Sequence, residues 1–149
     1  MTLFEQVSEG IIAAMKAREK EKLEALRNLK KLMLEARTSK GASAELTDEE
    51  SLKLVQKLVK QGKESAEIYE KQNRTDLYTQ EMGQVRVLES FLPLPLTDEE
   101  LTEAVTAIVR ETGATSLKEM GRIIGIASGR LAGKADGKDI AAKVKTLLS

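Results

Sequence analysis

Four Ser or Thr residues in this chain are each followed, three residues later, by a glutamate. The four pairs are Thr2/Glu5, Thr47/Glu50, Thr97/Glu100 and Ser116/Glu119. In such a capping box, the hydroxyl and the carboxylate bind backbone N–H groups that the first turn of a helix leaves unpaired. The spacing therefore marks four helix starts along the chain.

Apolar residues recur with helical spacing after these starts, and no segment alternates as a strand would. We predict helices over residues 3–17, 19–38, 48–71, 75–91, 98–112, 117–131 and 138–148. Ala, Leu, Glu, Lys and Arg dominate, and aromatic residues make up only 3% of the chain. This composition favours helices with an aliphatic core, so the sequence predicts an all-α protein.

Both prolines lie in one short segment, which runs from Phe91 to Leu96. Proline cannot continue a helix, and it restricts the residue before it to extended conformations. We therefore predict a helical N-terminal domain over 1–92, a proline-containing linker over 93–96 and a three-helix module over 97–149. The leucines of the segment suggest a docked linker rather than a free tether.

The chain contains neither cysteine nor histidine. This composition excludes disulfides and thiolate metal sites, and it removes the commonest general base and metal ligand. We therefore expect no cofactor, no metal, no catalytic residue and no self-contained enzyme. The N-terminus lacks the features of a signal peptide, and no apolar run approaches ~18 residues, so we expect a cytoplasmic protein with no membrane partner.

The net charge is zero, but the charges are unevenly distributed. Residues 113–149 carry seven basic and three acidic side chains, whereas residues 97–112 carry one basic and five acidic side chains. Any binding of a polyanion must therefore be local. The basic candidates for phosphate contacts are Lys118, Arg122, Arg130, Lys134 and Lys138, and a solvated basic surface is the alternative interpretation. A second basic run, formed by Lys16, Lys20, Arg27, Lys30 and Lys31, is more typical of a solvated helix face.

Four glycines, Gly121, Gly125, Gly129 and Gly133, fall at intervals of four within this basic region. A glycine inside a helix costs roughly 0.5–1 kcal/mol relative to alanine, so the repeat needs a reason. Either a neighbouring helix packs tightly against the glycines, or a ligand or RNA backbone approaches them. The spacing alone slightly favours helix packing, and Gly125 is a further candidate for the nucleic-acid contact.

The segment from Gly133 to Lys138 suggests a phosphate-binding loop, but it does not complete the pattern. That pattern requires a glycine at position 132 and a Ser or Thr at position 139, where this chain has Ala132 and Asp139. We instead predict a turn in which Asp136 caps the last helix.

Several segments together resemble the GatB/YqeY family. The resemblance rests on FLPLPLTDEEL at 91–101, KEMGRIIG at 118–125 and GKADG at 133–137, with KQGKESAEIYE at 60–70 and NRTDL at 73–77 similar to the stand-alone YqeY branch. It implies a four-helix N-terminal bundle followed by a three-helix C-terminal bundle. The C-terminal bundle is shared with the tail of the GatB subunit of the glutamine-dependent aspartyl/glutamyl-tRNA amidotransferase.

The chain departs from the family pattern at three positions. Family members often have Arg where this chain has Gly62, Pro where it has Gly129, and Lys where it has Ala132. The change at 132 removes a basic group from the expected phosphate contacts. Gly129 in place of proline suggests a break or kink of the helix near Ser128–Gly129.

The resemblance implies tRNA affinity through the 118–138 region and does not support catalysis. The leading hypothesis is a non-catalytic tRNA-associated binding protein that is an accessory to the amidotransferase. One alternative is a protein-interaction scaffold that docks on a protein partner. A second alternative, by family analogy, is a carbon–nitrogen ligase that uses glutamine as the amido-nitrogen donor.

Overall fold

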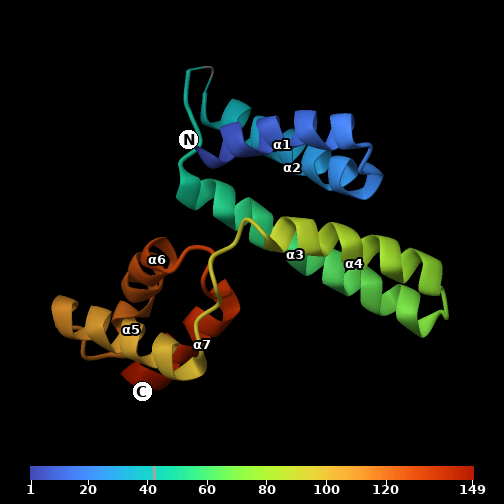
Figure 1. Ribbon diagram of the computed structural model, residues 1–149. Helices are drawn as coiled ribbons and strands as arrows, with labels where there is room; N and C mark the ends of the chain where they lie inside the picture. The colour runs from blue at the N-terminus through green and yellow to red at the C-terminus, as the bar shows by residue number, and fades with distance from the viewer. Residues whose placement is uncertain (42) are drawn as a thin grey trace. The chain divides into compact units, whose positions relative to one another are not determined.

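The computed structural model describes residues 1–41 and 43–149, and this part of the chain contains seven α-helices and no strand (Figure 1). The elements are α1 (Leu3–Ala17), α2 (Lys20–Lys40), α3 (Asp48–Lys71), α4 (Thr75–Glu89), α5 (Asp98–Thr112), the 3-10 helix η1 (Leu117–Glu119), α6 (Met120–Arg130) and α7 (Gly137–Leu148). The prediction of an all-α protein is confirmed, and α1, α3 and α5 have the predicted bounds.

Capping boxes begin these three helices as the sequence predicted. The hydroxyl oxygens of Thr2, Thr47 and Thr97 accept hydrogen bonds from the backbone N–H three residues later, at 3.2, 3.1 and 3.1 Å. The box at Ser116 precedes η1 instead, so the α-helix predicted from 117 begins only at Met120. At the other end of the module, the Asp136 side chain caps α7, as predicted.

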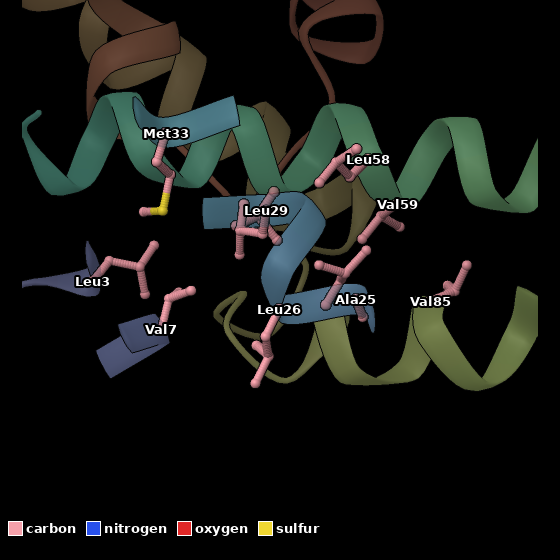
Figure 2. Packing of buried hydrophobic residues seen from close by; sticks show 11 residues of the cluster. Leu3, Val7, Ala25, Leu26, Leu29, Met33, Leu58, Val59 and Val85 are labelled. Carbon is pink, nitrogen blue, oxygen red and sulfur yellow. The ribbon is translucent and has the colours of Figure 1, made fainter. Parts of the chain in front are cut away.

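The chain divides into two compact units, Met1–Leu92 and Pro93–Ser149, and each has its own core. In the first unit α1 pairs with α2 and α3 pairs with α4, while α2 also packs on α4. Figure 2 shows aliphatic side chains from these helices meeting in one cluster, in which Leu29 and Met33 are fully buried. The second core joins α5, α6 and α7 around Val105, Ile123 and Val144.

The proline segment is anchored at both ends and exposed between them. Leu92 packs against the core of the first unit, and Leu96 packs against that of the second. The backbone N–H of Leu96 also donates to the carbonyl oxygen of Lys134 at 2.9 Å. Leu94 between the prolines is 88% exposed, so the expectation of a docked linker holds for its ends and is wrong for its middle.

Gly62 explains how closely α3 approaches α4. It is buried, and a Cβ atom at this position would lie 2.6 Å from Cγ2 of Val85. Val85 is β-branched on a helix and has little rotamer freedom, so it cannot move aside cheaply. The close approach therefore excludes a larger residue unless the helices separate.

We expect Gly62→Ala to destabilise the protein by about 1–2 kcal/mol, because overpacking outweighs the gain in helix propensity. Urea unfolding followed by circular dichroism measures this change. The substitution Val85→Ala should largely cancel the effect in the double variant. Gly121→Ala is the matched control, since an added Cβ there meets nothing within 4 Å and should stabilise by about 0.5–1 kcal/mol. Equal effects at the two glycines would contradict the packing argument.

Candidate nucleic-acid interface

Helix α6 presents one face to its own core and an unusually bare face to solvent. Ile123 and Ala127, one turn apart, are fully buried in the second core. On the opposite side Gly121, Arg122 and Gly125 are exposed, and Lys118 in the preceding η1 is exposed as well. The exposed face of α6 therefore includes Arg122 and Gly125, and Lys118 is exposed in the 3-10 turn that precedes this helix.

The exposed glycines are not explained by a neighbouring helix. A Cβ atom built on Gly121 or on Gly125 meets nothing within 4 Å. The preference for tight helix packing is therefore wrong for these two positions, because spacing shows which residues share a face but not what covers that face. Each glycine still costs roughly 0.5–1 kcal/mol in a helix, and nothing in the described part of this unit offsets that cost.

The helix also continues through Gly129. The backbone N–H of Leu131 donates to the carbonyl oxygen of Ala127 at 2.8 Å, and α6 ends at Arg130. The expected break near Ser128–Gly129 is wrong, because glycine keeps its N–H donor and can adopt helical dihedral angles, unlike the family's proline. The chain turns only afterwards, at Gly133, whose φ is 80°.

Arg122 is held by groups of its own unit. Its guanidinium donates to Glu119 Oε1 at 3.1 Å and to the carbonyl oxygen of Thr112 at 3.3 Å. Glu119 also accepts from the backbone N–H of Thr115 at 2.7 Å, and this bond is the main reason that the pKa of Glu119 is lowered. The charge of Arg122 is therefore partly neutralised in the free protein.

Arg130 is paired in the same way, but across two helices. Its guanidinium lies 2.7 Å from Oε2 of Glu111 on α5, and both side chains are about half exposed. The hydrogen bond raises the pKa of Arg130 and lowers that of Glu111. Sequence reasoning missed Glu111, because no spacing rule links residues on different helices. Glu119, in contrast, stands three residues before Arg122, and that spacing could have revealed the pair.

The lysines of the candidate site differ from its arginines in having no acidic partner among the described residues. Lys118, Lys134 and Lys138 are all exposed, and none forms an ion pair with a carboxylate of the described chain. Lys134 lies in the turn after α6, and Lys138 lies in the first turn of α7. The unneutralised positive charge of the site thus resides on its lysines rather than on its arginines.

We also searched the described residues for a metal site, a membrane-spanning helix and a pocket. No group of three or more His, Cys, Asp or Glu residues there could hold a metal ion, and no described helix is long and apolar enough to cross a membrane. A pocket of about 420 Å³ lies where α2 meets α4. It is lined by Glu19, Lys20, Glu21, Lys22, Gly83 and Val87. It brings together charged side chains, two of which, Lys22 and Glu19, pair at 3.8 Å.

The model of the Yqey-like protein family matches residues 4–148, which is nearly the whole chain. The chain belongs to the YqeY-like protein family. No curated protein matches it. The YqeY-like assignment confirms the resemblance noted in the sequence, and it covers both units of the fold.

Proposed function

We propose that this YqeY-like protein is a non-catalytic binding protein for tRNA and an accessory of the glutamine-dependent tRNA amidotransferase. The observation that carries the proposal is the solvent face of α6, where Gly121 and Gly125 are exposed, together with the exposed Lys118 of the preceding turn, which forms no ion pair with the described residues. Glycines let a ribose–phosphate backbone approach the helix closely, and the lysines then reach its phosphates. Residues 97–149 are the proposed binding module, the second of two helical bundles.

The first test is a titration of the full chain with bulk tRNA at about 50 mM and about 200 mM salt. Each phosphate contact contributes about 0.7–0.9 to the slope of log affinity against log salt, so three lysine contacts should lower the affinity about 20–40-fold over this range. Absence of salt-sensitive binding even at the lower concentration would remove the proposal.

Gly125→Leu should leave the fold intact and weaken tRNA binding about tenfold or more. A Cβ added at this exposed position meets nothing within 4 Å in the free protein, whereas a leucine side chain should block close approach of the RNA backbone. Circular dichroism checks the fold, and the tRNA titration checks binding. Ala107→Leu is the matched control, because it adds similar bulk at an exposed position of α5 and should not affect affinity. Unchanged binding by Gly125→Leu would contradict the role of the glycines.

We expect Glu111→Gln to raise the affinity for tRNA about two- to fivefold. The substitution releases Arg130 from its carboxylate partner, so the guanidinium becomes available to phosphate. Glu103→Gln changes the net charge equally at another exposed position of α5, and Glu103 forms no ion pair with the residues that the structure describes. An equal increase in both variants would show a general charge effect and not a role for Arg130.

A protein-interaction scaffold is the second candidate. Arg122 and Arg130 are each paired with a glutamate, and this pairing favours a scaffold because it lowers the positive charge of the α6 region. In that case a protein partner should co-purify after nuclease treatment. Gly125→Leu should then abolish partner binding, while charge reversal at Lys134 and Lys138 should matter little. Nothing in the described residues favours the carbon–nitrogen ligase alternative.

A further inference from the structure

Helix α1 has a second stripe of side chains beside the one that it buries. The buried stripe contains Leu3, Val7 and Ala14. The second stripe, at heptad spacing, consists of Phe4, Ser8, Ile11 and Met15. Phe4 and Ile11 pack partly against the core, whereas Met15 is 52% exposed and the neighbouring Ile12 is 55% exposed.

Helix α2 repeats this arrangement. Its buried stripe includes Leu26, Leu29 and Met33. The second stripe continues through five positions of the same heptad pattern, namely Leu23, Arg27, Lys30, Leu34 and Arg37. Because heptad positions recur on one side of a helix, these side chains form a single line along α2.

The two second stripes lie side by side. The ring of Phe4 on α1 lies beneath two cations of α2, with its centroid 5.7 Å from Nζ of Lys30 and 5.0 Å from Cζ of Arg37. Helices α1 and α2 run alongside each other in Figure 1. We call the two stripes together the outer face of the α1–α2 pair.

The outer face is apolar and basic, and it contains no acidic residue. Arg27, Lys30 and Arg37 form no ion pair with a carboxylate of the described chain, unlike Arg122 and Arg130 in the second unit. The stripe on α1 runs over twelve residues, from Phe4 to Met15, and the eleven steps between them cover about 16 Å of helix. Three turns of another helix would match this length.

We propose that the outer face docks an acidic amphipathic helix of a partner protein. Apolar residues of that helix would cover Met15, Ile11 and Leu34, and carboxylates at its flanks would pair with Arg27, Lys30 and Arg37. Heptad spacing on both stripes supplies the register that packing of a third helix requires. The proposal is independent of tRNA binding by the second unit.

Other occupants fit the outer face less well. A second copy docked through the same face would bring its own cations against these cations, and its acidic helix α5 already buries Leu101, Val105 and Ile108 in its own core. RNA would satisfy the cations but leave the apolar stripe in water. An anionic bilayer would satisfy both kinds of group, but a bilayer imposes no heptad spacing.

The test uses the full chain labelled with ¹⁵N and a synthetic, end-capped peptide with the sequence of residues 97–112. This probe has the required chemistry, because it carries five acidic residues and one basic residue, with Leu101, Val105 and Ile108 on one helical face. We expect saturable amide shifts confined to the outer face, with a Kd of about 10–500 µM. A control peptide with Asn and Gln in place of Asp and Glu should bind at least about tenfold more weakly.

Two variants of the protein locate the binding. Met15→Ser and Arg27→Glu should each weaken binding of the acidic peptide at least about fivefold, whereas Lys57→Glu, at an exposed site on α3, should not.

The proposal is overturned if no saturable shift appears by about 1 mM peptide, or if both peptides bind equally. Binding through this face to vesicles of 70% phosphatidylcholine and 30% phosphatidylglycerol, or to tRNA, without peptide binding would also overturn it. Failure here leaves the tRNA titration of the C-terminal lysines unaffected, so the two proposals are tested separately.

Discussion

Replacing Lys118, Lys134 and Lys138 together with glutamine should lower the affinity for bulk tRNA about 100-fold at about 50 mM salt. These are the cations of the proposed site that pair with no carboxylate of the described residues, and each lost charge-assisted contact should cost about fivefold in affinity. The slope of log affinity against log salt should fall by about 2–3 as well. The measurement is a titration followed by fluorescence anisotropy of labelled tRNA.

The control for this variant removes three lysines from α3 in the first unit, Lys53, Lys57 and Lys71. All three are exposed, so the fold should be retained and the net charge changes by the same amount. A large loss of affinity in both triple variants would show that net charge, and not the C-terminal site, governs binding. Retained affinity in the first variant would leave the scaffold as the better hypothesis.

Leu29→Ala should destabilise the first unit by about 2–5 kcal/mol, because Leu29 is fully buried in its core and truncation leaves a cavity. Tyr69 and Tyr78 lie on α3 and α4, so tyrosine fluorescence follows this unit during urea unfolding. The unfolding midpoint reported by tyrosine should therefore fall strongly. Leu34→Ala, at a position that is 37% exposed, should cost much less.

Ile123→Ala provides the converse case. Ile123 is fully buried in the core of the second unit, and the two cores share no residue. We expect the second unit to lose a similar amount of stability, seen in unfolding followed by circular dichroism. The unfolding midpoint reported by tyrosine fluorescence should stay unchanged. A shift of the tyrosine midpoint in this variant would contradict the description of two separate cores.

Much of the secondary structure could be predicted because its signals are local. A capping box places the start of a helix within a few residues, and α1, α3 and α5 all begin after a threonine of this kind. Helices α2 and α4 follow Glu19 and Arg74, whose side chains form no cap, and there the prediction depended on apolar spacing and the loops between helices. The 3-10 turn at Leu117 escaped prediction, because the same box can begin either kind of helix.

The candidate site was less predictable, because its properties depend on contacts between helices. The sequence identifies Arg130 as a cation, but only the packing of α5 against α6 brings Glu111 within 2.7 Å of it. The glycines show a related difficulty. Gly62 stands alone in its helix pattern and proves to be a packing position, whereas the regular repeat of Gly121 and Gly125 faces open space.

The short proline segment connects two units that each carry a proposed binding surface. Leu92 belongs to one core and Leu96 to the other, so few residues separate the two units. When two binding surfaces are joined by a short segment, engagement of the first raises the effective concentration of the second to the millimolar range, provided that the geometry allows both to bind. Two individually weak contacts, one on each unit, would then retain a common target by avidity. Lengthening the segment would weaken that retention without changing either surface.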